Sequence, residues 1–124
     1  MSPLVIRTRN KTIPFTLNRD GASIIHARLS VWSQVGTPTQ KRVHILFFED
    51  ALDGRETFRR DLDPGNYFCV LQVFIREDLN GTFEYLHLAA EQPVHAVTRG
   101  DVNTGGAEGE GALFRHEYIL AVTA

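Results

Sequence analysis

A turn that leads into a long β-rich run is the feature that most limits the folds open to this chain. Residues 62 to 67 read Leu-Asp-Pro-Gly-Asn-Tyr, and residues 68 to 75 read Phe-Cys-Val-Leu-Gln-Val-Phe-Ile. Proline presets the backbone angle φ of the first central turn position, and glycine accepts the positive φ of the second. Aromatic and β-branched residues fit the pleated surface of a strand. The stretch therefore predicts an antiparallel β-protein.

Further turn signals divide the chain into pieces of strand length. Asp20-Gly21 and Asn80-Gly81 are typical of tight hairpins, and Asp53-Gly54 adds another turn. No segment shows an apolar period of about 3.6 residues with helix caps, so we expect little helix. The pieces between the turns predict strands near residues 4 to 8, 12 to 17, 23 to 32, 42 to 49, 55 to 61, 66 to 76, 82 to 89, 94 to 98 and 112 to 123.

Apolar residues occupy both faces of the two segments 42 to 49 and 66 to 76. Side chains alternate between the two faces of a strand, and we expect Tyr67, Cys69, Leu71 and Val73 to point into the core. One face of a strand in a two-layer sandwich normally meets water. The second face of these segments should therefore be covered, either by another subunit or by a loop or the N-terminal segment of the same chain. We predict a self-association interface at four side chains, Phe48, Phe68, Val70 and Phe74.

The turn at residues 62 to 67 resembles the entry into a central strand of immunoglobulin-like and carboxypeptidase-regulatory-like sandwich domains, where the tyrosine packs back over the corner. The resemblance implies a fold and no activity, because sandwiches carry many unrelated functions. We expect residues 1 to 124 to form one all-β domain. It should be an antiparallel two-layer β-sandwich, immunoglobulin-like or jelly-roll-like, with about seven to nine strands. A glycine-rich segment, 101 to 111, should be a mobile loop within it.

Composition narrows the possible partners and location. The chain has 124 residues, of which 43% are hydrophobic and 23% charged, as in ordinary globular proteins. A net charge of -2 gives no long-range attraction to phosphate, so we expect no nucleic acid partner. No apolar run approaches the roughly 18 residues of a membrane span, and the first residues lack the pattern of a secretory signal. With Cys69 as the single cysteine, we expect a cytoplasmic protein.

Acidic residues lie close to several of the turns. If the strands run up and down, the turns near Asp20, Asp53 and Asn80 emerge at one end. Oxygen ligands from adjacent loops are what Ca²⁺ requires, and C2-like domains bind it in this way. The alternative is that acidic residues simply belong in solvated turns. The pattern predicts a Ca²⁺ site formed by Asp20, Glu49, Asp50, Asp53, Glu77 and Asp78.

Motifs for catalysis or for transition metals are missing from the sequence. The histidines show no H-x-x-x-H or H-x-H pair, although His87 and His95 would approach each other if residues 82 to 98 form a hairpin. Trp32 and Phe48 could stack against a sugar. We therefore expect a non-enzymatic interaction or assembly module, with no cofactor, that forms homo-oligomers or binds a protein partner. The alternative is a ligand-binding module, dependent on Ca²⁺ or binding a carbohydrate or another small molecule.

Overall fold

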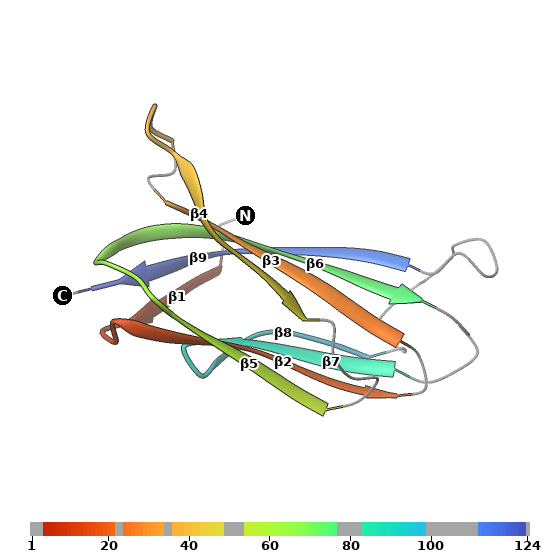
Figure 1. Ribbon diagram of the computed structural model, residues 1–124. Coiled ribbons are helices and arrows are strands. Elements are labelled where there is room, and N and C mark those ends of the chain that lie inside the picture. The colour runs from red at the N-terminus through yellow and green to blue at the C-terminus, as the bar shows by residue number, and fades with distance from the viewer. Residues whose placement is uncertain are drawn as a thin grey trace.

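The structure is a computed structural model, and it describes six stretches of the chain: residues 4–21, 24–33, 36–48, 54–76, 83–98 and 112–123. These residues form nine strands and no helix (Figure 1). The strands are β1 (Leu4–Thr8), β2 (Thr12–Gly21), β3 (Ile24–Ser33), β4 (Lys41–Phe48), β5 (Gly54–Asp61), β6 (Gly65–Arg76), β7 (Phe83–Ala89), β8 (Gln92–Thr98) and β9 (Ala112–Val122).

Every strand expected from the sequence is present, and the all-β prediction is confirmed. Only β2 is much longer than expected. It continues to Gly21 because it is an inner strand of its sheet, with β5 paired on one side and β7 on the other. Asp20-Gly21 therefore does not close a hairpin between β2 and β3, which lie in different sheets.

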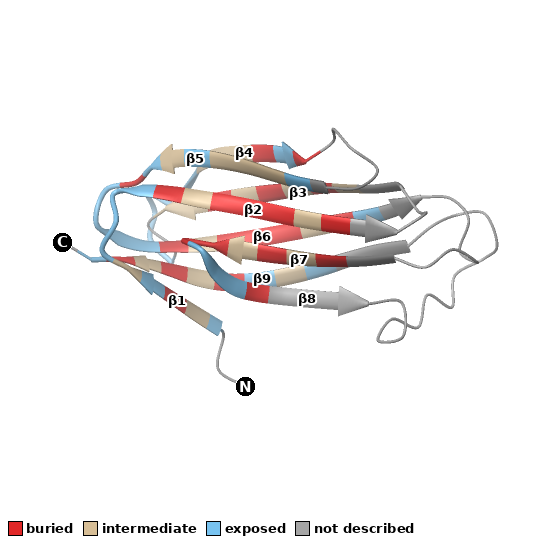
Figure 2. Cartoon of the chain, turned by 90° about the horizontal axis from the view of Figure 1, so that it is seen from below, coloured by how far each residue is buried: buried red, intermediate tan, exposed pale blue. Residues whose placement is uncertain are grey.

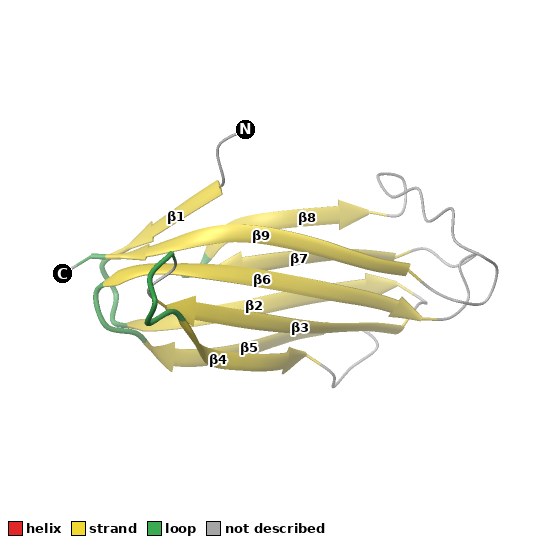
Figure 3. Cartoon of the chain, turned by 90° about the horizontal axis from the view of Figure 1, so that it is seen from above, coloured by secondary structure: helices red, strands yellow, loops and turns green. Residues whose placement is uncertain are grey.

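The strands form two stacked sheets (Figure 3). The five-stranded sheet has the order β1-β9-β6-β3-β4, and the four-stranded sheet has the order β5-β2-β7-β8. Neighbouring strands are antiparallel at every described pair but one, since β1 runs parallel to β9. The chain crosses repeatedly from one sheet to the other, and β3–β4 and β7–β8 are the consecutive strands that pair. The two-layer sandwich is thus confirmed, but a simple series of hairpins is not.

The core lies between the sheets, and Figure 2 shows buried residues alternating with others along the strands. Tyr67, Cys69, Leu71 and Val73 of β6 are all buried, as the alternation predicted. They share one continuous apolar cluster with residues of the other sheet, such as Phe15. The Tyr67 hydroxyl donates a hydrogen bond of 2.6 Å to the Asp63 carbonyl oxygen and so folds the tyrosine back over the turn.

Candidate functional site

The outer face of the five-stranded sheet, the side turned away from the four-stranded sheet, carries an apolar row. The row consists of Val5, Ile119, Phe68 and Trp32, which are neighbours in register on four adjacent strands, β1, β9, β6 and β3. Each of them alternates with residues that point into the core, so each points outward. All four are half-buried. An apolar stripe thus crosses most of the width of this outer face.

Two phenylalanines further along the same outer face are its most exposed large apolar side chains among the residues whose burial is described. Phe47 of β4 is 46% exposed and Phe74 of β6 is 40% exposed. Val70 lies between this pair and the apolar row and is only 7% exposed. Of the predicted interface residues, Phe68, Val70 and Phe74 therefore lie on the outer face.

Phe48 does not lie on the outer face, and its predicted role at an interface is wrong. It is fully buried, and its ring centroid lies 5.2 Å from that of Phe58 and 6.4 Å from that of His87. The register explains this, since Phe48 is opposite Ala27, which points into the core. Phe47 takes the outward position instead. Because Trp32 points outward, Trp32 and Phe48 cannot form one stacking surface for a sugar.

Three arginines on the outer face have partners within the chain. Arg28 Nε donates to Gln72 Oε1 at 3.1 Å, and Arg28 Nη2 donates to the same oxygen. Arg115 Nε lies 2.7 Å from Glu117 Oε2 in an ion pair. The guanidinium of Arg42 lies 5.9 Å from the centre of the Trp32 ring. Charged groups with these internal partners can be covered at a lower desolvation cost than unpaired ones.

The acidic residues predicted to bind Ca²⁺ lie outside the part of the chain whose side chains are described. This holds for Glu49, Asp50, Asp53, Glu77 and Asp78, and for the side chain of Asp20. Four strands, β2, β4, β6 and β8, end on the same side of the sandwich (Figure 3). Strand β2 contains Asp20, and β4 and β6 come directly before the other acidic residues in the sequence. Among the described residues, no three His, Cys, Asp or Glu side chains form a group that could hold a metal ion. The Ca²⁺ site stays a prediction, and segment 101–111 also lies outside the described residues.

Two Tyr–His pairs, which the sequence analysis missed, join the sheets through the core. Tyr85 and His87 of β7 face His116 and Tyr118 of β9, so a Tyr-x-His pattern meets a His-x-Tyr pattern. The Tyr85 hydroxyl lies 2.6 Å from His116 Nε2, and the Tyr118 hydroxyl lies 2.8 Å from His87 Nε2. His87 Nδ1 lies 2.9 Å from the Thr16 carbonyl oxygen. Since a carbonyl only accepts, Nδ1 carries a proton, and in the neutral form of the imidazole Nε2 then accepts from Tyr118.

Cys69 sits beside this network and is chemically protected. It is opposite Tyr118 in register and hydrogen-bonded to its hydroxyl. Burial raises the pKa of the Cys69 thiol to about 12. Burial also raises the pKa of Tyr85 and of Tyr118, and the neighbouring Cys69 raises that of Tyr118 further. A thiol with such a pKa holds its proton at neutral pH and is a poor nucleophile.

The backbones of His87 and His95 are opposite each other in the β7–β8 hairpin, as expected if residues 82 to 98 form a hairpin. The side chain of His95 is not described. Both ring nitrogens of His87 make hydrogen bonds in the core.

Comparison with known proteins adds no relative. No protein-family model, curated protein or solved structure matches this chain. The described residues include no helix long and apolar enough to cross a membrane.

Proposed function

We propose that this protein is a non-enzymatic β-sandwich module that works through protein association, and that it pairs with a second copy through the outer face of the five-stranded sheet. One observation carries the proposal. The outer face holds both the apolar row, Val5, Ile119, Phe68 and Trp32, and the exposed pair Phe47 and Phe74. In a two-layer sandwich this surface meets water, so the fold itself requires no apolar residues there.

The size of the hydrophobic gain indicates how much of the face must be covered. Full burial of a phenylalanine stabilises by about 1.5 to 3 kcal/mol. Phe47 and Phe74 are already more than half buried, so each can contribute only part of that amount. Association costs at least about 4 kcal/mol in lost translation and rotation. The two phenylalanines of each copy barely offset that cost, so we expect the interface to include the apolar row as well.

The chemistry of the face suits a two-fold interface. Phenylalanine, tryptophan and arginine are the residue types that concentrate at the centres of protein interfaces. Trp32 with Arg42 above it, and Arg28 bound to Gln72, provide such anchors here. A two-fold axis lets one patch cover its own copy, and this is the commonest arrangement of homo-oligomers.

Sedimentation equilibrium of aspartate variants tests the proposal. We expect the wild type to sediment as a dimer at high concentration, and Phe74→Asp and Phe47→Asp to sediment as folded monomers, because each variant places a charge in the interface. Leu4→Asp is a matched control, since Leu4 is 42% exposed but is opposite the inward-facing Tyr118 rather than on the outer face. It should still form the dimer.

A folded wild type that remains monomeric at high concentration would remove the proposal. It would favour cover of the outer face by a segment of the same chain. Equal dissociation of the Leu4→Asp control would also count against it, because the effect would then not belong to the outer face.

A further inference from the structure

Two exposed charges separate the apolar parts of the outer face. On β6, Phe68 belongs to the apolar row, and Phe74 lies near the far end of the same strand. Arg115 and Glu117 of the neighbouring strand β9 are opposite the outward β6 residues between these two phenylalanines. The Arg115 and Glu117 side chains are 55% and 45% exposed. A second copy that covers both apolar parts must therefore cover these two charges as well.

The position of the charges limits how two copies can face each other. Stacked sheets of the aligned class keep their strands within about 30° of each other, so a two-fold axis between two copies runs either along the strands or across them. An axis along β6, the middle strand of the sheet, places β9 of one copy over β3 of the other. Arg115 then meets Arg28 of the second copy, because both arginines are opposite Gln72 in register. Like charges in such contact repel, which disfavours this arrangement.

An axis across the strands avoids this conflict. It keeps each strand over the same strand of the second copy and reverses the order of residues along it. When the axis passes over His116 of β9, Arg115 of one copy meets Glu117 of the other, since the two residues lie on either side of His116. Arg115 and Glu117 already pair within each copy at 2.7 Å. The side chains of the two copies therefore form a ring of alternating charge.

The same axis also brings the apolar parts of the two copies together. His116 is opposite Leu71 in register, so the axis crosses β6 at Leu71. Phe74 of one copy then lies over Phe68 of the other, because the two phenylalanines are equally far from Leu71 along the strand. One axis thus satisfies the charges and the apolar side chains together.

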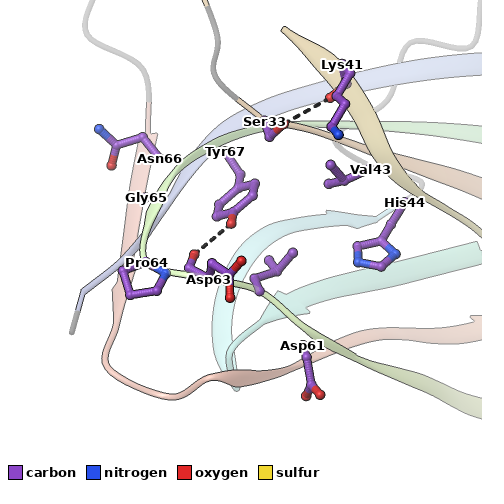
Figure 4. A pocket seen from close by; sticks show the side chains of 11 residues that line it. Ser33, Lys41, Val43, His44, Asp61, Asp63, Pro64, Gly65, Asn66 and Tyr67 are labelled. Carbon is purple, nitrogen blue, oxygen red and sulfur yellow. Dashed lines mark hydrogen bonds between the residues drawn. The ribbon is translucent and has the colours of Figure 1, made fainter. Parts of the chain in front are cut away.

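The edge of the sandwich beside β4 offers a second copy a poorer surface. A cavity of about 440 Å³ opens there, between β4 and the segment that joins β5 to β6 (Figure 4). Lys41 and Asp63 bring charges to its lining, and Tyr67 forms part of its wall. The centre of a protein interface is closely packed and poor in charged residues. A hollow with charged side chains does not meet these conditions, so the outer face is the better contact.

We propose that two copies pair about an axis that crosses the strands of the outer face, and that contacts between Arg115 of one copy and Glu117 of the other specify this arrangement. The arrangement rests on the self-association proposed above and fixes the orientation of the two copies. Charges of opposite sign that meet in this way steer association and exclude orientations in which like charges would meet.

Charge reversal at each position tests the arrangement. Arg115→Glu leaves two acidic side chains on each copy to face those of the other, and Glu117→Arg leaves two basic ones. We expect each variant alone to form the dimer at least about tenfold more weakly than the wild type at low salt, because like charges then meet. An equimolar mixture of the two variants should restore wild-type affinity, since each contact then joins opposite charges. Sedimentation equilibrium measures the affinities, and native mass spectrometry identifies the mixed dimer by its mass.

Arg59→Glu is the matched control. It makes the same change of charge as Arg115→Glu, but Arg59 is exposed on the outer face of the four-stranded sheet, opposite Pro14 in register. The dimer of this variant should form with wild-type affinity. Equal weakening by Arg59→Glu and Arg115→Glu would show an effect of net charge and overturn the assignment.

Two further results separate this arrangement from the self-association itself. A wild type that stays monomeric would remove both. A wild-type dimer that dissociates with Phe74→Asp, but keeps or gains affinity with Arg115→Glu, would leave the outer-face interface standing and overturn the axis across the strands. An axis along β6 predicts that gain, because it places residue 115 against Arg28 of the second copy. Failure of the mixture to restore the dimer would also overturn the arrangement.

Discussion

The outer faces of the two sheets differ in chemistry although both sheets contribute to the same core. The five-stranded sheet turns Phe47, Phe74 and the apolar row outward. The outer face of the four-stranded sheet is mostly polar. There the Thr16 and Thr57 hydroxyls lie 2.9 Å apart across β2 and β5, and Arg59 is exposed. A polar outer face is thus sufficient for this fold, and the apolar one needs another explanation.

The inner faces of the two sheets do not show this difference. Leu71 in the five-stranded sheet and Leu17 in the four-stranded sheet are both fully buried in one cluster. In both sheets, the alternation of side chains therefore directs one apolar face into the core. The apolar residues on one outer face are an addition to that requirement, and this contrast is the basis of the proposed self-association.

The largest effect that we predict tests whether the inner faces form a single core. Leu71→Ala should lower the free energy of unfolding by about 2 to 5 kcal/mol, because a buried leucine loses both transfer energy and packing. Leu88→Ala is the comparison variant, since Leu88 points outward from the four-stranded sheet and is half-buried. It should cost clearly less. Urea unfolding measures both losses. A loss below about 0.5 kcal/mol for Leu71→Ala would contradict the claim that the inner faces form a single core.

The strands could be predicted from the sequence because turn residues and alternation act locally. Both faces of residues 67 to 73 are apolar, but the turn before Tyr67 indicated which face is buried, and the burial of Tyr67, Cys69, Leu71 and Val73 was predicted correctly. In β4, Phe47 and Phe48 are both apolar, so alternation could not decide which of them points inward. Which phenylalanine points inward depends on the register between β4 and β3, where Phe48 is opposite Ala27. That register is set by pairing between strands and not by the local sequence.

The contacts between Tyr85 and His116 and between His87 and Tyr118 could not be predicted for a similar reason. Each partner lies on a different sheet, and the stacking of two sheets leaves no periodic signal in the sequence. The mirrored spacing of the Tyr-x-His and His-x-Tyr patterns was the one available indication. The cavity at Lys41 and Asp63 likewise depends on the crossing from β5 to β6.

The second prediction concerns the hydrogen bonds that join the sheets. Tyr118→Phe removes the donor to His87 Nε2, 2.8 Å away, and leaves that buried nitrogen without its tyrosine partner. We expect a loss of about 1 to 3 kcal/mol in unfolding free energy. Tyr85→Phe should cost less, because its partner His116 is only half-buried. The opposite order in urea unfolding would contradict the distinction between the two pairs.

The third prediction is a loss of stability at alkaline pH. The pKa of the Cys69 thiol rises from 9.0 to about 12 on folding, so above pH 9 the unfolded state releases a proton that the folded state keeps. The free energy of unfolding therefore falls as the pH rises from about 9 to 12. At one pH unit above the ordinary thiol pKa, the loss relative to neutral pH is about 1 kcal/mol. Cys69→Ala should show a shallower fall in the same range, with the remainder due to Tyr85 and Tyr118. Equal slopes for the two proteins would contradict the burial of the thiol.

Contacts between copies, observed by NMR in a sample that mixes isotope-labelled and unlabelled protein, test the central claim most directly. The account predicts intermolecular nuclear Overhauser effects, which strengthen with concentration, from the methyl groups of Ile119 and Ile45. Ile45 lies on the apolar outer face because it is opposite Ser30, which alternates with the buried Leu29 and Val31. The account predicts none from Leu86 and Leu88, which alternate with the buried Tyr85 and His87 and so point outward from the four-stranded sheet. Intermolecular effects confined to the two leucines, or none from any of these residues at high concentration, would contradict the proposal that the apolar outer face is an interface between two copies.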